Sequence, residues 1–227
     1  LQQSSAASDV YKRQVCLLVF LLLGWVNLWV ADRTAPVRLE NNVPPVVQRF
    51  HEVFGRRMRL VRYGVATLLG ILVSLPATQQ WEDLLLFRNS QTFGVSDPQF
   101  GADVGFYVFR LPLISFLSDW LFAALLLIII ITAITHVLNG AVLFAGMIPT
   151  VRQATKVHMA VLLAILAILR AGDYWLARFD LTNETRGVVQ GATYAVVNAE
   201  LPALMLLTLI ALLTAVLYLV TIRTDRW

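Results

Sequence analysis

The sequence predicts an all-α, multi-pass helical membrane protein with about five transmembrane helices. Of its 227 residues, 58% are hydrophobic and 14% are charged, and the mean hydropathy is +0.71. This hydrophobic fraction is higher than the core of a soluble protein needs, and it is typical of integral membrane proteins. The apolar residues fall into segments at about 15–30, 60–78, 113–138, 157–179 and 201–222. The lipid bilayer is therefore the first expected partner.

Residues 1–14 are interpreted as non-native, because Ser4 to Gln14 back-translates without interruption into a transposon adapter used in DNA sequencing. The chain lacks an initiator Met and stops soon after an apolar segment, so we expect it to be a fragment of a longer protein. Without the adapter residues, the chain has sixteen lysines and arginines and thirteen aspartates and glutamates. This small excess predicts no nucleic-acid partner.

Arginine counts predict the orientation of the apolar segments. The connection 31–60 has six arginines against three acidic residues, which predicts that it is cytoplasmic. Segment 79–112 has two arginines against four acids and is expected to be an outer interfacial loop. Arg59 and Arg62 are expected to snorkel at the inner surface. Val46–Met58 fits either an amphipathic helix on the inner leaflet or an arginine cluster that fixes orientation, and we favour the cluster.

The fourth apolar segment contains charged residues. Its leucines and isoleucines favour insertion by roughly 3 kcal/mol, whereas a central arginine opposes it by roughly 2.5–3.5 kcal/mol. Arg170 is therefore expected to reach outward and to pair with Asp173, one turn further along. The pair is either structural or, together with Asp119 of the third segment, part of an ion or proton pathway. Asp119 would cap its helix or line a cavity.

The sequence contains no recognisable catalytic, cofactor-binding or metal-binding motif, so an enzyme is the least favoured class. Cys16 lies in an apolar segment, where a lone thiol behaves as a small hydrophobe. His51, His136 and His158 are spread over cytoplasmic segments and span ends, and we do not expect them to converge.

The longest polar and aromatic interruption runs from Phe93 to Pro112. Its two aspartates suggest either cation ligands or turn formers, since Asp97 precedes Pro98 and glycines permit tight turns. Its aromatic residues are typical of a membrane interface. The candidate signature residues are Phe93, Gly94, Asp97, Pro98, Phe100, Gly101, Asp103, Phe106, Tyr107 and Pro112.

The run WEDLLLFRNSQTFGVSDPQFGADVGFYVFRLP, with the later AGDYWLARFDL and GATYAVVNAELPA, resembles the bacterial uncharacterised protein family 0182. The resemblance covers essentially residues 15–227 and rests on fixed aromatic, proline, glycine and aspartate positions. It implies location in the bacterial cell membrane and several N-terminal spans followed by a large extracytoplasmic domain. That remainder of the chain would be a partner of this part, and the resemblance implies no catalytic residue or cofactor.

Three functional hypotheses follow from the sequence. The preferred one is a membrane anchor and assembly module for an extracytoplasmic domain, because the spans are mostly uncharged and no site is evident. A transporter or channel subunit using Asp119, Arg170 and Asp173 is the alternative. A membrane-embedded enzyme is the third.

Overall fold

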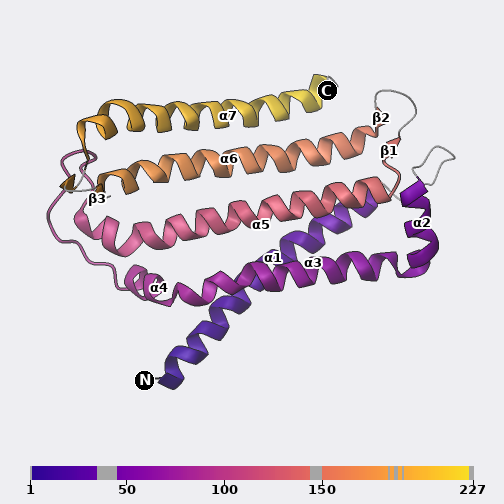
Figure 1. The fold of residues 1–227 in the computed structure, drawn as a ribbon, viewed down its shortest axis with the longest axis horizontal. Coiled ribbons are helices and arrows are strands. Elements are labelled where there is room, and N and C mark those ends of the chain that lie inside the picture. The colour runs from indigo at the N-terminus through magenta and orange to yellow at the C-terminus, as the bar shows by residue number, and fades with distance from the viewer. Residues whose placement is uncertain are drawn as a thin grey trace.

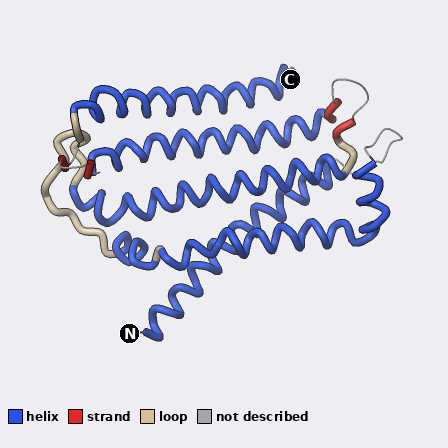
Figure 2. The backbone as a smooth tube through the Cα atoms, in the orientation of Figure 1, coloured by secondary structure: helices blue, strands red, loops and turns tan. Residues whose placement is uncertain are grey.

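The computed structural model is a bundle of long helices (Figures 1 and 2). It describes residues 2–34, 45–143, 150–183, 185–186, 189–190 and 192–224. The α-helices in these ranges are α1 (Gln2–Thr34), α2 (Pro45–Phe54), α3 (Met58–Ser74), α4 (Trp81–Arg88), α5 (Leu111–Leu138), α6 (Gln153–Asn183) and α7 (Leu201–Thr224). The all-α prediction is confirmed.

Five helical segments are long and apolar enough to cross a membrane, as the sequence predicts. They cover Gln14–Thr34, Met58–Ala77, Phe106–Leu138, Gln153–Leu181 and Val196–Arg223. Most extend a few residues past the apolar runs, because short polar and aromatic stretches continue the helices. The interval expected to be an outer loop also contains α4, so only its middle part lacks helix.

The helices form a row with one crossing member (Figure 1). Helices α5, α6 and α7 run side by side in alternating directions, and α1 crosses α3 diagonally. Helix α4 and the connection after it lie at one end of the bundle, called here the loop end. Helix α2 lies at the opposite end, called the α2 end, so the two ends carry different polar structures.

Two short hairpins join neighbouring helices. At the α2 end, β1 (Val142–Leu143) pairs with β2 (Thr150–Val151) between α5 and α6. At the loop end, β3 (Thr185–Arg186) pairs with β4 (Val189–Gln190) between α6 and α7. Both pairs are antiparallel, as a short connection between antiparallel helices requires.

The core on one side of the bundle joins α1, α3 and α5. Phe20 is fully buried against Trp120 and Ile128, and its ring lies over Gly70. A Cβ at position 70 would approach the Phe20 ring to 2.8 Å, so glycine lets α1 and α3 cross closely. The indole nitrogen of Trp120 also donates to the Val73 carbonyl at 2.9 Å. Packing therefore holds α1 against α3, and the hydrogen bond joins α3 to α5.

Further clusters connect the row. Leu125 and Ile129 of α5 pack against Leu162 of α6. Leu181 packs with Val196 and Leu201 where α6 turns into α7. Apolar side chains on the rest of α7 are mostly exposed in this chain, as expected for a helix that faces lipid or further helices.

Candidate functional site

The connection from α4 to α5 folds back on itself around Asp103. Gly94 has a φ angle of +70° and Gly101 one of +67°, which glycine adopts readily. The Asp103 carboxylate accepts the backbone N–H groups of Phe93 at 3.0 Å, Gly94 at 2.9 Å and Gly105 at 2.7 Å. These donors, Phe93 foremost, lower the pKa of Asp103 below its ordinary range.

Asp97 accepts hydrogen bonds in the second half of this connection. Its Oδ2 accepts the N–H of Phe100 at 2.8 Å and the hydroxyl of Tyr107 at 3.1 Å. Its own N–H donates to the Ala102 carbonyl at 2.7 Å, and Pro98 follows in the turn. Both aspartates thus bind donors of their own segment, which is what the turn-forming interpretation expects.

The same segment docks on α6 through aromatic rings. The ring centroids of Phe100, Phe106 and Tyr107 lie 4.9, 5.2 and 6.2 Å from that of Phe179. The Arg178 guanidinium lies 5.4 Å from the centre of the Phe100 ring. The signature residues therefore join the connection to a distant helix.

The remaining signature residues hold the edges of the connection. Phe93 stacks on Phe109 with ring centroids 5.7 Å apart. Pro112 is the second residue of α5, which continues directly from the π-helical turn Phe106–Arg110. The signature residues therefore form a folded segment, and the carboxylates of Asp97 and Asp103 bind hydrogen-bond donors within it.

The charged pair predicted in the fourth apolar segment is present in α6. Arg170 Nη1 lies 3.5 Å from Asp173 Oδ2. The guanidinium also lies over the rings of Tyr174 at 4.5 Å and Phe122 at 5.4 Å. Asp173 is buried, and its Oδ1 accepts the Ser118 hydroxyl from α5. The pair therefore links α6 to α5.

Asp119 lies more than two turns from the start of α5, too far to cap the helix, and it lines a cavity. Lining a cavity is one of its two predicted roles. The cavity has a volume of about 290 Å³ and lies between α5, α6 and α7. Its polar lining consists of Ser115, Ser118, Asp119, Arg170, Asp173, Tyr174 and Asp180. All three charged residues singled out from the sequence thus meet at one place.

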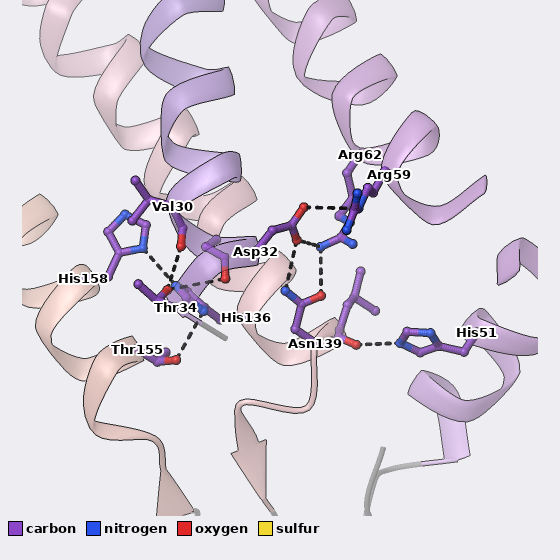
Figure 3. Close-up of polar contacts among 12 residues, drawn as sticks. Val30, Asp32, Thr34, His51, Arg59, Arg62, His136, Asn139, Thr155 and His158 are labelled. Atoms are coloured by element: carbon purple, nitrogen blue, oxygen red, sulfur yellow. Dashed lines mark hydrogen bonds and ion pairs between the residues drawn. The ribbon is translucent and has the colours of Figure 1, made fainter. Parts of the chain in front are cut away.

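A second polar cluster, at the α2 end, joins three helices (Figure 3). Arg62 Nη1 of α3 donates to Asp32 Oδ1 of α1 and to Asn139 Oδ1 just after α5, both at 2.9 Å. Asn139 Nδ2 completes the triangle by donating to Asp32 Oδ1 at 3.2 Å. Arg62 is buried, so the expectation that it snorkels to the surface is wrong, whereas Arg59 is exposed.

Two histidines converge beside this triangle, contrary to the expectation that the histidines stay apart. His136 Nε2 lies 3.1 Å from His158 Nδ1, because α5 and α6 are antiparallel neighbours. His136 Nδ1 lies 3.2 Å from Thr155 Oγ1, and His158 Nε2 lies 3.2 Å from Asn27 Oδ1. The contacts form one chain from α6 through α5 and back to α6 and α1.

The proton positions in this chain follow from Asn27. Its amide nitrogen donates to the Leu23 carbonyl at 2.7 Å, so its Oδ1 can only accept. His158 must therefore carry a proton on Nε2. With both rings neutral, its Nδ1 accepts and His136 donates from Nε2. The remaining nitrogen of His136 accepts from Thr155. In this arrangement all four ring nitrogens have a partner.

Helix α2 is tied to the same end by the third histidine. His51 Nε2 lies 2.6 Å from the Leu138 carbonyl at the end of α5. Val47 is buried, and Phe50 and Phe54 contact each other. The segment expected mainly as an arginine cluster is thus also an amphipathic helix that packs on the bundle.

The fold and these buried polar clusters define a helical membrane protein with five candidate spans. The chain belongs to the uncharacterised protein family UPF0182, whose family model matches residues 5–227. The match includes part of the segment 1–14, and the interpretation of that segment as non-native stays a prediction.

Curated relatives agree with this assignment. The chain is 36% identical to a UPF0182 protein of Mycolicibacterium paratuberculosis over 219 residues, which is 93% of this chain and 22% of that protein. It is 35% identical to one of Frankia alni over 93% of this chain and 21% of the relative. The chain therefore spans about a fifth of the length of these relatives. No solved structure matches it.

Proposed function

We propose that this chain is a membrane anchor and assembly module of a longer protein of the bacterial cell membrane, whose large remaining domain is extracytoplasmic. The observation that carries the proposal is that two clusters of polar groups within the described spans bind one another between helices. The Asp32–Arg62–Asn139 triangle and the histidine chain together join α1, α3, α5 and α6. Such groups specify how helices assemble in lipid.

The orientation in this proposal follows the arginine distribution. The α2 end carries the arginine-rich connection and would lie in the cytoplasm, with the loop end outside. A domain outside the membrane would then meet the folded segment Phe93–Pro112. The length of the relatives, about five times that of the matched region, supports the presence of such a domain.

Single cysteines test the orientation. In a Cys16→Ala background, Ser96→Cys at the loop end should react with a membrane-impermeant maleimide in intact cells. Gln153→Cys at the α2 end should react only after lysis, and both side chains are exposed in this chain. Labelling of Gln153→Cys and not Ser96→Cys in intact cells would reverse the proposed orientation.

A second candidate function is transport or conduction, favoured by the cavity between α5, α6 and α7. It contains charged residues at a depth where they are seldom retained without a role. Replacing Arg170 and Asp173 together by leucine separates the two candidates. An anchor should still insert and should complement a deletion strain, because the pair is removed as a unit. Normal insertion without complementation would contradict the anchor role.

A further inference from the structure

Exposed arginines at the α2 end of the bundle form a surface called here the basic patch. They are Arg33, Arg49, Arg57 and Arg59. Asp32 lies beside them, but the buried guanidinium of Arg62 already holds it at 2.9 Å, so it offsets little of their charge. In the part of the chain that the structure describes, no hydrogen bond or ion pair engages the side chain of Arg49 or Arg57. The basic patch therefore has donors available for an anionic partner.

The basic patch lies at the depth of lipid headgroups. Helix α2 runs across the ends of α3 and α5 rather than along them (Figure 1). Trp29 is 54% exposed near the end of α1, and the Arg33 guanidinium lies 5.0 Å from the centre of its ring. An exposed tryptophan at the end of a span is typical of the membrane interface. A membrane surface would therefore meet the patch directly.

Exposed apolar side chains accompany the arginines. Val53, one turn after Arg49 in α2, is 75% exposed, and Leu60, next to Arg59, is 73% exposed. Val47 of α2 is buried, so this helix has one side on the bundle and another side uncovered. A nucleic acid or an acidic protein surface would match the arginines alone, whereas a lipid surface also covers the apolar side chains. The combination favours lipid.

We propose that the basic patch binds the headgroups of anionic phospholipids through Arg49, Arg57 and Arg59, with Val53 and Leu60 at the acyl boundary. A guanidinium donates two hydrogen bonds to phosphate oxygens in a fixed fork. Attraction of about 1 kcal/mol per arginine near an anionic surface corresponds to roughly fivefold tighter binding. Placing this lipid in the cytoplasmic leaflet rests on the proposed orientation, whereas the binding itself does not.

Lipid binding is tested on the protein purified in a neutral detergent, where both ends of the bundle are accessible. The melting temperature should rise in a saturable way with added phosphatidylglycerol and rise less with phosphatidylcholine. Replacing Arg49 and Arg57 together by glutamine should raise the phosphatidylglycerol concentration for half-maximal stabilisation at least tenfold, because two donors are lost. Arg59 stays in this variant, so its ion pair with Asp32 is unchanged.

Replacing Arg88 and Arg110 together by glutamine is the matched control, because it removes two exposed arginines at the loop end. It should leave the response to phosphatidylglycerol unchanged. If the variant without Arg49 and Arg57 does not fold, Glu52→Gln decides the outcome. Glu52 is an exposed acid of α2, so its neutralisation should tighten phosphatidylglycerol binding.

The proposal is overturned if phosphatidylcholine stabilises the protein as well as phosphatidylglycerol does, or if the two double variants respond alike. Unchanged or weaker binding in Glu52→Gln would also overturn it. Equal stabilisation by sodium phosphate would assign the patch to a free anion instead of a lipid headgroup. These outcomes leave the labelling and complementation tests of the anchor role unaffected, because neither test depends on the lipid.

Discussion

Arg62 of α3 donates to Asp32 of α1 across 2.9 Å, and the guanidinium is 7% exposed. Arg59, one turn earlier in the same helix, lies 4.0 Å from the other oxygen of Asp32 and is 80% exposed. One carboxylate therefore has two arginine partners in very different surroundings. The contribution of each to stability should differ accordingly.

We predict that Arg62→Gln destabilises the protein by about 1–3 kcal/mol, because Asp32 and Asn139 lose a buried donor. Arg59→Gln should change stability by only about 0–1 kcal/mol, since exposed ion pairs are worth little. Melting of the two variants in detergent, followed by tryptophan fluorescence, compares them directly. Equal effects would mean that the triangle does not hold the α2 end together.

The histidine chain gives a second prediction, at Asn27. Asn27→Leu leaves the Nε2–H of His158 without an acceptor in a half-buried place, which should destabilise the protein by about 1–2 kcal/mol. Asn198→Leu is the matched control. Asn198 also donates to the carbonyl four residues earlier, at 2.9 Å, but it is exposed.

The control substitution should fall within about 0.5 kcal/mol of the parent, as exposed substitutions usually do. The same melting experiment measures both variants. Each asparagine donates to the backbone carbonyl four residues before it. If Asn198→Leu melts as early as Asn27→Leu, the loss of stability comes from this local bond and not from the histidine chain.

Helical class and the number of spans could be predicted from the sequence because apolar length alone determines them. The pairing of Arg170 with Asp173 could also be predicted, because residues three apart share a helix face. The contact of His136 with His158 could not, since it depends on the register of α5 against α6. The one available signal was that both histidines lie near facing ends of consecutive spans.

The burial of Arg62 was missed for a related reason. An arginine at the end of an apolar segment is expected to reach the surface when the helix is considered alone. Only the crossing of α1 over α3 brings Asp32 within reach and makes the buried position favourable. The sequence signal was a pair of opposite charges at adjoining ends of two consecutive spans.

Gly105 supplies a third prediction. A Cβ at this position would lie 2.1 Å from the Gln91 carbonyl oxygen and 2.8 Å from Asp103 Oδ1. Gly105→Ala should therefore force the segment apart and destabilise the protein by roughly 1–3 kcal/mol, as overpacking does. Protease cleavage between residues 89 and 105 should increase in parallel.

Gly64→Ala is the control for that substitution. Gly64 lies in α3, and a Cβ added there would meet nothing within 4 Å, so alanine should stabilise the helix by about 0.4–1 kcal/mol. Opposite signs for the two glycine variants are expected in one melting experiment. A neutral Gly105→Ala would show that the segment does not need the close approach to Gln91.

The last prediction concerns pH and Asp103. Backbone N–H groups, Phe93 foremost, lower the folded-state pKa of this carboxyl below its ordinary value of 3.8. A lowered folded-state pKa means that the carboxylate stabilises the segment fully above the unfolded-state value. This contribution is lost as the pH falls from about 3.8 through the folded-state pKa. Pepsin cleavage between residues 89 and 105 should therefore rise over that interval.

Asp103→Asn should remove this pH dependence and leave the segment more susceptible to cleavage at every pH. The three N–H groups donate to both carboxylate oxygens, whereas the amide has one acceptor oxygen and its NH2 would face at least one of these donors. Glu82→Gln provides the matched control, since it removes an exposed acid at the same end of the bundle without touching these donors. An Asp103→Asn protein that still opens over the same pH interval would assign the transition to another carboxyl group. In that case the N–H groups around Asp103 would not be what closes the segment.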